Sequence, residues 1–335
     1  MTMCTQSEGP ALRGLPLYAL IDPYFLDYPE HGIDLAACCS FDSLRAARRS
    51  NWHGYEIYLA EGDDPVREVS RLPYLVSLAD AEKSMIDTLA EAAVAEQRAF
   101  LAGDPQPYRI GALIETWMAP QDLIRRLEKM WAYSYKGGGH HRYLHIADRR
   151  AFETVVHLFD TQTIARWLGP IARWHYLGRD FDWRPAQGEA DSNDGWYVDA
   201  RFGMRRVVAP ERAMEGAVLQ IGLREHQRLR EGEAVSRALT RWQRAGRDVD
   251  AQTYELAWAG VQVAIREGLV QPEDKGAFAY RWMIDPDCAG CPPVGPALAR
   301  SRLEARTFVS VLNETEFRSI AETHFDTANH QSSAT

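Results

Sequence analysis

The first half of the chain alternates short apolar runs with stretches that carry apolar residues at helical spacing. The apolar runs have the length of buried strands, and they occupy residues 17–22, 55–60, 74–78 and 110–117; residues 171–177 alternate apolar and polar positions, which also predicts a strand. The sharpest helical stripe follows Pro120 and comprises Leu123, Ile124, Leu127, Met130 and Trp131. This alternation predicts a mixed α/β domain, which we place at residues 17–178.

Capping and turn residues predict where these elements end. Asp80 is expected to cap a helix that Gly103 terminates, because Asp accepts backbone N–H bonds and Gly adopts the left-handed turn. Residues 142–159 hold two apolar runs on either side of a short charged segment, and this pattern predicts a hairpin.

The stretch VHLFDTQTIARWLGPI, residues 156–171, predicts a sharp change from strand to helix. Asp160 is expected to cap a short helix with one apolar face. Gly169 and Pro170 then stop the helix, since proline cannot donate the next backbone hydrogen bond and glycine accepts the turn. We expect these residues to form a folded corner of the domain.

The second half of the chain has a different pattern. Residues 179–198 are polar, acidic and rich in turn formers, which predicts a linker. Residues 199–325 predict a helical lobe, with helices near 210–231, 233–246, 250–269, 273–284, 295–305 and 313–324. Residues 1–16 and 326–335 are expected to be a flexible start and a disordered tail. The predicted fold class is therefore α+β, a mixed α/β domain followed by an all-helical lobe.

The composition narrows the class of function. The chain has 335 residues, of which 46% are apolar, and its formal net charge is -9. Nucleic-acid binders usually present a basic face, so this acidic chain is not expected to be one. No apolar run reaches the roughly 20 residues that a membrane span needs, and the first residues lack a signal-peptide pattern. We expect a cytoplasmic protein with no nucleic-acid partner and no membrane span.

Residues with catalytic or metal-binding chemistry are few. His140, His141 and His145 are the best metal candidates, but adjacent residues of a strand point to opposite sides, so His140 and His141 are not expected to share an ion. Cys288 and Cys291 form a single C-x-x-C without further ligands, which favours a plain loop. The sequence has neither a G-x-S-x-G elbow nor an H-E-x-x-H motif. We expect no enzyme activity, no cofactor and no metal site.

The helical lobe offers candidates for partner binding. Eleven arginines lie between Arg201 and Arg247 against five glutamates, and they form either a solvated helix face or a rim that orients an acidic partner. Short helices with wide apolar faces can form a groove for a partner helix, although the same residues would serve equally well as the lobe's own core. The candidate partner-binding residues are Arg205, Arg206, Trp242, Tyr254, Trp258, Trp282 and Met283.

Four phrases in the first half carry a resemblance to a known family. They are LYALIDP (17–23), PYLVSL (73–78), IGALIETWMAPQDLIRRLEKM (110–130) and VHLFDTQTIARWLGPIARW (156–174). Together they resemble the effector-adaptor (chaperone) proteins of bacterial type VI secretion, the Tap/TEC family, over about residues 17–178. Phe159 and Asp160 stand for the family's Tyr-Asp, but Thr161 and Gln162 depart from the Pro-Arg that usually follows.

The resemblance implies a protein that is not an enzyme. Members of the family hold a toxic effector in the cytosol of the producing cell and load it onto the VgrG spike protein before secretion. The expected partners are therefore a secreted effector and VgrG, and Asp160, Gly169 and Pro170 would be structural residues of the docking domain. Residues 264–283 are similar to the helical tail of many such adaptors.

Two other functions stay open on the sequence alone. One is a metal- or His-dependent hydrolase that uses the region of His140, His141 and His145. The other is a regulatory module that senses a small ligand between its lobes, and a ligand that raises the melting temperature without any protein partner would favour it.

Overall fold

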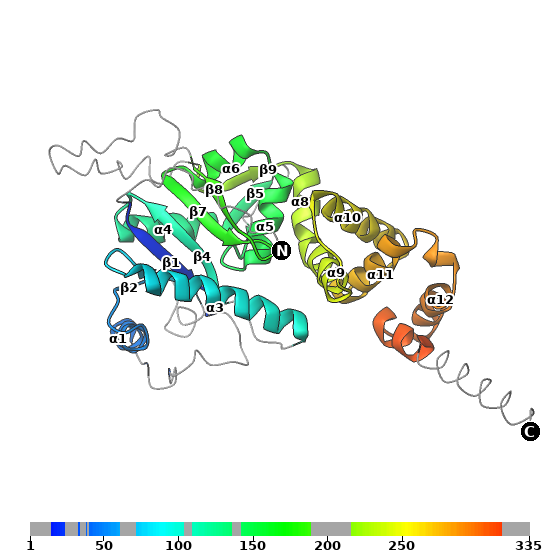
Figure 1. The fold of residues 1–335 in the computed structure, drawn as a ribbon. Coiled ribbons are helices and arrows are strands. Elements are labelled where there is room, and N and C mark those ends of the chain that lie inside the picture. Colours follow the sequence, from blue (N-terminus) through cyan, green and yellow to red (C-terminus); the bar gives the residue numbers. More distant parts are fainter. Residues whose placement is uncertain are drawn as a thin grey trace, which may run out of the picture. The chain divides into compact units, whose positions relative to one another are not determined.

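A computed structural model describes residues 15–23, 33, 38, 40–60, 72–103, 109–135, 142–188 and 216–316 of the chain. The chain divides into two compact units, Met1–Gly222 and Leu223–Thr335. The first unit contains β-sheets with helices and the second is helical (Figure 1), so the α+β class predicted from the sequence is confirmed. Among the described helices, none has the length and apolar content that crossing a bilayer would require.

A six-stranded sheet forms the centre of the first unit (Figure 1). Its strand order is β2-β3-β1-β4-β7-β8, and every neighbouring pair is antiparallel. Strands β1, β3 and β4 are almost continuously buried because most of their residues are apolar on both faces. In β7 the half-buried Arg173 and His175 alternate with buried apolar residues. The strands are β1 Leu17–Ile21, β2 Ile57–Leu59, β3 Tyr74–Ser77, β4 Ile110–Thr116, β7 Ile171–Leu177 and β8 Trp183–Gln187.

One face of this sheet packs against α1 (Phe41–Asn51) and α3 (Lys83–Ala102). Leu89 and Ala93 of α3 join strand residues such as Val76 in one buried cluster. Their burial fixes which side of each strand points to the helices, because a register slip of one residue would turn every apolar side chain to the other face.

The opposite face packs against α5 (Arg149–Leu158) and α6 (Thr161–Leu168). Phe152 of α5 stacks on Trp174 of β7, and the centroids of the two rings are 4.6 Å apart. Trp167 of α6 stacks on the same phenyl ring at 6.0 Å. Buried aromatic rings in stacked arrangements contribute beyond their buried area, so this trio fixes both helices on the sheet.

Arg126 connects α4 (Pro120–Met130) to the end of α6. Its side chain is fully buried and donates hydrogen bonds to the backbone carbonyls of Trp167, at 2.6 Å, and Leu168, at 3.0 Å. The last carbonyls of a helix have no partner within the helix, and the guanidinium supplies one. Gly169 follows at φ 52°, and β7 begins two residues later.

A smaller sheet of three strands also belongs to the first unit. Its order is β6-β5-β9, with β5 Ala132–Tyr135, β6 Arg142–Tyr143 and β9 Leu219–Ile221. β9 runs parallel to β5, and the hydroxyl of Ser134 lies 2.6 Å from Oε1 of Gln220. Trp167 donates its indole N–H to the carbonyl of Ala217 at 3.1 Å, which fastens the segment before β9 to α6.

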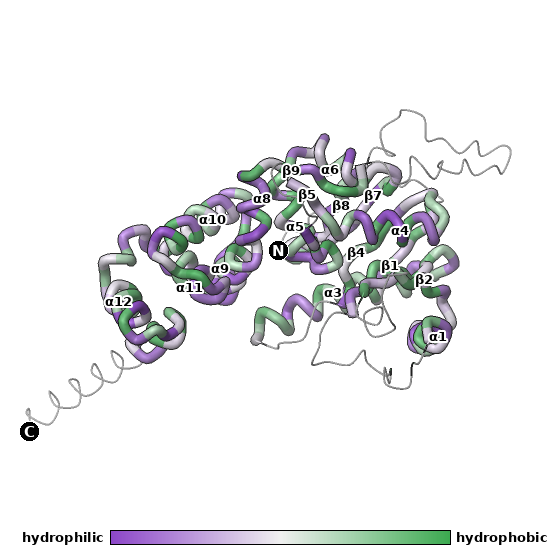
Figure 2. The backbone as a smooth tube through the Cα atoms, turned by 180° about the vertical axis from the view of Figure 1, so that it is seen from behind, coloured by the Kyte–Doolittle hydropathy of each residue, from purple (hydrophilic) through white to green (hydrophobic). Residues whose placement is uncertain are grey.

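Helices form the described part of the second unit. They are α8 Leu223–Arg230, α9 Gly232–Arg244, α10 Ala251–Arg266, α11 Pro272–Ile284, a short 3-10 helix Cys288–Gly290, α12 Val294–Glu304 and residues 308–316. Figure 2 shows hydrophobic and hydrophilic residues alternating along α9, α10 and α11, as expected of helices that bury one face. Two glycines bring α11 close to its neighbours: a Cβ at Gly260 would lie 3.0 Å from Cα of Ala279, and one at Gly276 would lie 2.7 Å from Cβ of Arg237.

The predicted hairpin at residues 142–159 is wrong. Arg142–Tyr143 form a short strand, but residues 149–158 form α5. Asp148 caps this helix by accepting the N–H of Arg150, and Phe152 and Val155 face the core at helical spacing. Burial of that face against the sheet outweighs the strand preference of the β-branched residues in the segment.

Other boundaries also differ from the predictions. Asp80 does not cap α3; the helix begins after Glu82, whose side chain makes no capping hydrogen bond, and it ends at Gly103 as predicted. Residues 183–187 were predicted to lie in a linker, but they form β8, an edge strand that pairs with β7. Its polar outward-facing residues give it no apolar run in the sequence. The predicted helix at 210–231 is wrong at residues 219–221, which form β9.

The division between the units falls after Gly222 and not at residues 179–198, because β8 and β9 pair with strands of the first unit. The predicted flexible start and disordered tail, residues 1–16 and 326–335, lie outside the described residues except for 15 and 16. The predicted helices of the second unit from residue 233 onward are present, with ends that shift by a few residues, and the last is described only at 308–316.

Replacing Asp160 by Ala should lower the melting temperature of the chain. The carboxylate accepts the backbone N–H of Thr163 at 2.7 Å, so Ala leaves that first-turn N–H without its acceptor. Asp160→Asn is the matched control, since Asn caps helices about as well as Asp. The hydrogen bond from Thr163 lowers the pKa of Asp160, so the cap's contribution is present at neutral pH and is lost as the pH falls through that lowered value. Equal melting temperatures for the Ala and Asn variants at pH 7 would contradict this role.

Replacing Gly169 by Ala should destabilise the chain more than the same change at Gly103. Both glycines have positive φ, 52° and 101°, which costs an L-residue about 1–2 kcal/mol. A Cβ at Gly103 meets no atom within 4 Å, whereas one at Gly169 would lie 2.5 Å from Nη2 of Arg126. Loss of the hydrogen bonds from that guanidinium raises the expected cost at Gly169 to roughly 3 kcal/mol. Urea unfolding of both variants measures the difference, and equal costs would show that the contact with Arg126 does not matter.

Candidate functional site

Four of the five large apolar residues proposed for partner binding lie together in the second unit. Trp242 of α9, Tyr254 and Trp258 of α10, and Met283 of α11 belong to or pack against one buried cluster. Tyr254 and Met283 are buried, so they serve the core, whereas the two tryptophans are half-buried. Trp282 packs against a different cluster. Within the shared cluster, Trp242 and Trp258 are therefore the candidates that combine a packed side with an exposed one.

Each of these tryptophans carries an arginine over its ring. Cζ of Arg247 lies 4.4 Å from the ring centroid of Trp242, and Cζ of Arg228 lies 5.3 Å from that of Trp258. The indole N–H of Trp242 donates to the carbonyl of Asp248 at 2.9 Å. A guanidinium over an indole is a favourable cation–π contact that also holds the ring in one orientation. We call Trp242, Trp258, Arg228 and Arg247 the tryptophan–arginine surface.

Trp and Arg are the residues most enriched among the energetic hot spots of protein interfaces. A ring fixed in orientation loses little conformational entropy when a partner covers it, so this surface is suited to binding a protein. Sequence analysis identified the tryptophans but missed Arg228 and Arg247 as their companions. Their spacing is no guide, since Arg228 comes from α8 and reaches a tryptophan of α10. Ile284, 43% exposed beside Met283, was also missed.

The arginine-rich stretch is largely neutralised by carboxylates of neighbouring helices. Arg237 pairs with Glu233 at 2.8 Å and also with Glu273, and Arg241 pairs with the same Glu273. Arg228 forms a bidentate pair with Glu255. These pairs remove much of the positive field that the sequence alone predicts. Arg205 and Arg206, the other predicted contact residues, lie outside the described residues.

A buried ion pair fixes the start of α11 against α9. Nζ of Lys275 lies 2.6 Å from Oε2 of Glu231, and the side chains of both residues are less than a tenth exposed. Breaking a buried pair by removing one partner leaves an uncompensated charge and destabilises the fold strongly. Asp274, the residue before Lys275, accepts the backbone N–H of Val309 at 3.0 Å. The helices behind the tryptophan–arginine surface are therefore held by polar contacts as well as by the apolar cluster.

The histidine candidates of the sequence do not form a metal site among the described residues, where no group of three potential ligands is present. His140 and His141 lie outside those residues. His145 instead pairs with Asp22, the residue after β1, and Nε2 lies 2.9 Å from Oδ2. Burial would lower the pKa of His145, but the contact with the Asp22 carboxylate outweighs it and raises the pKa above the ordinary value.

Further charged residues join α3, α5 and the end of β7. Arg149 donates to the carbonyl of Ala93 and contacts Glu96, and Arg179 pairs with Glu153 at 3.1 Å while both side chains are almost completely buried. Burial raises the pKa of Glu96 despite the nearby Arg149 guanidinium. The sequence showed no sign of this layer, because its partners are more than 20 residues apart. These contacts position the helices against one another.

The capping and terminating residues of the corner at residues 156–171 lie where the sequence predicts them, but a helix, α5, and not a strand precedes the corner. Asp160 caps α6, which ends at Leu168 before Gly169 and Pro170. Cys288 is buried in the turn after α11, and Cys291 is exposed at its end; both are free thiols. No metal-binding group includes them within the described part of the chain.

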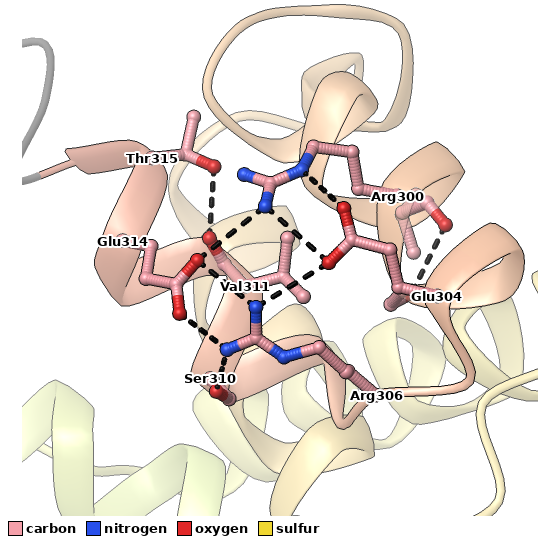
Figure 3. A network of polar contacts seen from close by, with 9 residues as sticks. Arg300, Glu304, Arg306, Ser310, Val311, Glu314 and Thr315 are labelled. Atoms are coloured by element: carbon pink, nitrogen blue, oxygen red, sulfur yellow. Dashed lines mark hydrogen bonds and ion pairs between the residues drawn. The ribbon is translucent and has the colours of Figure 1, made fainter.

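A network of two arginines and two glutamates joins α12 to residues 308–316 (Figure 3). Arg300 pairs with Glu304 and Glu314, and Arg306 pairs with the same two carboxylates. The two arginines therefore share both acceptors across the turn at Ala305, whose φ is 51°. These ion pairs bridge the turn and stabilise its conformation.

Comparison with known proteins finds no relative of this chain: no family model, no curated protein and no solved structure matches it. The residues and their geometry, together with the phrases in the first half of the chain, are the basis for a functional proposal.

The carboxyl group of Glu314 should titrate far below an ordinary glutamate. The hydrogen bond from Arg306 lowers its pKa to about 2, so the network's contribution is present above the unfolded pKa and is lost as the pH falls toward that value. Carboxyl NMR titration of the full chain should show a midpoint near that value, and Arg306→Gln should raise it. Arg302→Gln is the control, because Arg302 pairs with Glu267 instead. A midpoint that Arg306→Gln leaves unchanged would show that the network does not hold this carboxylate.

Proposed function

We propose that the chain is a cytoplasmic adaptor, or chaperone, that binds a toxic effector and loads it onto the VgrG spike of a bacterial type VI secretion system. The observation that carries this proposal is the ordered set of four phrases in residues 17–174 that resembles the Tap/TEC adaptors.

The position of these phrases in the fold supports treating them as one signature. LYALIDP contains β1, PYLVSL contains β3, and the third phrase contains β4 and α4. The fourth contains the end of α5, all of α6 and the first residues of β7. Strands β3, β1, β4 and β7 are direct neighbours in the sheet. The four phrases therefore lie in adjacent elements of one buried sheet.

The chemistry of the described residues agrees with a binding role. Buried charged side chains described in the first unit, such as Arg149 and Arg179, form ion pairs that position helices. The second unit presents the tryptophan–arginine surface, whose residue types are typical of protein recognition. Because many neighbouring arginines already pair with glutamates, we expect contact with the effector to depend on the indole rings more than on net positive charge.

Affinity purification of the full chain from the cytosol of its own cell tests the proposal directly. The expected result is recovery of one effector and of VgrG with the chain, identified by mass spectrometry. Recovery of neither protein under conditions in which the secretion system is assembled would overturn the proposed function.

The tryptophan–arginine surface makes a separate prediction. Arg247→Gln should leave the fold intact, because that guanidinium is exposed over the Trp242 ring. Trp258→Ala should weaken effector binding by roughly thirtyfold or more, because truncating a hot spot costs about 2 kcal/mol. Trp282→Ala is the matched control, because this residue packs against the other cluster. Isothermal titration and thermal unfolding of each variant separate binding from folding. If Trp258→Ala and Trp282→Ala weaken binding equally, the surface is not the contact.

A further inference from the structure

The two cysteines of the second unit are placed by one tight turn. Cys288 opens the 3-10 helix that follows α11, and Cys291 is the residue that ends it. The backbone N–H of Cys291 donates to the carbonyl of Cys288 at 3.1 Å, which is the i to i+3 bond of this turn. The chain enters α12 three residues later, at Val294. The C-x-x-C pair is thus held in a defined turn between two helices, and it is not part of an irregular loop.

The geometry of such a turn suits a disulfide. A hydrogen-bonded i to i+3 turn keeps the two Cα atoms within about 7 Å, and disulfides join Cα atoms that are roughly 4.4–6.8 Å apart. In a 3-10 helix the side chains at i and i+3 lie almost in line along the axis. The turn therefore brings the two cysteines into the range of separation that a disulfide spans.

The two thiols differ in access to solvent. Cys291 is exposed, whereas Cys288 is 6% exposed and packs in the cluster that contains Phe308 and Val311. Burial, with a smaller contribution from Asp285, raises the pKa of the Cys288 thiol to about 11. A small oxidant can therefore reach only Cys291 directly, and Cys288 is the group that reacts second.

We propose that Cys288 and Cys291 form a redox-responsive dithiol that small-molecule disulfides convert into an intramolecular disulfide. The Cys291 thiolate attacks one sulfur of oxidised glutathione, and the S–S bond breaks with release of one glutathione thiolate. Cys288 then loses its proton to solvent, and its sulfur attacks the Cys291 sulfur and expels the second glutathione. Two cysteine thiols are oxidised, and one disulfide is reduced to two thiols.

The consequence for the fold is local. The bond closes a very short loop, so it constrains the unfolded chain little and should change the unfolding free energy only slightly. It would fix the turn that joins α11 to α12 and hide an exposed thiol. This inference stands on the second unit alone and does not depend on the proposed adaptor function.

The test uses the full, reduced chain incubated with glutathione at increasing ratios of oxidised to reduced form, then acid quenching, alkylation and peptide mass mapping. The reduced chain has five cysteines, and a Cys288–Cys291 link should leave three of them open to alkylation. Mapping assigns any reaction at Cys4, Cys38 or Cys39 separately. Linkage of Cys288 to Cys291 supports the inference, whereas both residues remaining reduced at the highest ratio would overturn it.

Two variants assign the order of events. In Cys288→Ala the resolving thiol is absent, so one glutathione should accumulate on Cys291 and stay there. In Cys291→Ser the exposed thiol is absent, and Cys288 should remain unmodified. If the unchanged chain also keeps glutathione on Cys291 at equilibrium, Cys288 does not resolve it and the dithiol proposal fails. The unchanged chain thus decides the question even if the alanine variant folds poorly.

Discussion

The buried guanidinium of Arg126 is the contact on which the arrangement of the first unit depends. A charge without water must be paired or hydrogen-bonded, and here the last carbonyls of α6 accept from it. The same contact leaves no room for a side chain at Gly169. A Cβ at Gly188 would also collide, at 1.9 Å, with the carbonyl oxygen of Ile171. One arginine and two glycines therefore set where α6 stops and where β7 and β8 can pair, and those strands form one side of the sheet.

The sequence predicts this unit well where burial is simple and poorly where pairing is distant. β1, β3 and most of β4 show as apolar runs, whereas β7 alternates, with Arg173 and His175 on one face. α5 contains β-branched residues that favour a strand locally, but the helix places Phe152 and Val155 against the core. β9 is short, and its partner strand lies more than 80 residues earlier. No local pattern could have identified that pairing.

The candidate site shows the same division. Its tryptophans are visible in the sequence as large apolar residues, but their burial depends on which helices meet. Tyr254 and Met283 face inward, whereas Trp242 and Trp258 keep an exposed side beneath an arginine. The arginines suggested a basic rim, yet Glu273 on another helix neutralises two of them. The sequence of one helix does not show which carboxylates of neighbouring helices pair with its arginines. The net charge of the site was therefore its least predictable property.

The edge of the main sheet bears on how a partner could be recognised. Pro185 of β8 is opposite His175 of β7. In this antiparallel ladder, hydrogen-bonded pairs such as Ala172 with Gly188 alternate with pairs that are not hydrogen-bonded, and Pro185 belongs to the second kind. The nitrogen of Pro185 therefore faces away from the sheet, where it has no N–H to offer. An added strand would find its hydrogen bonds interrupted in the middle of β8, and proline at this place is a common protection against edge-to-edge pairing. Recognition of a partner by strand addition is thus disfavoured at β8.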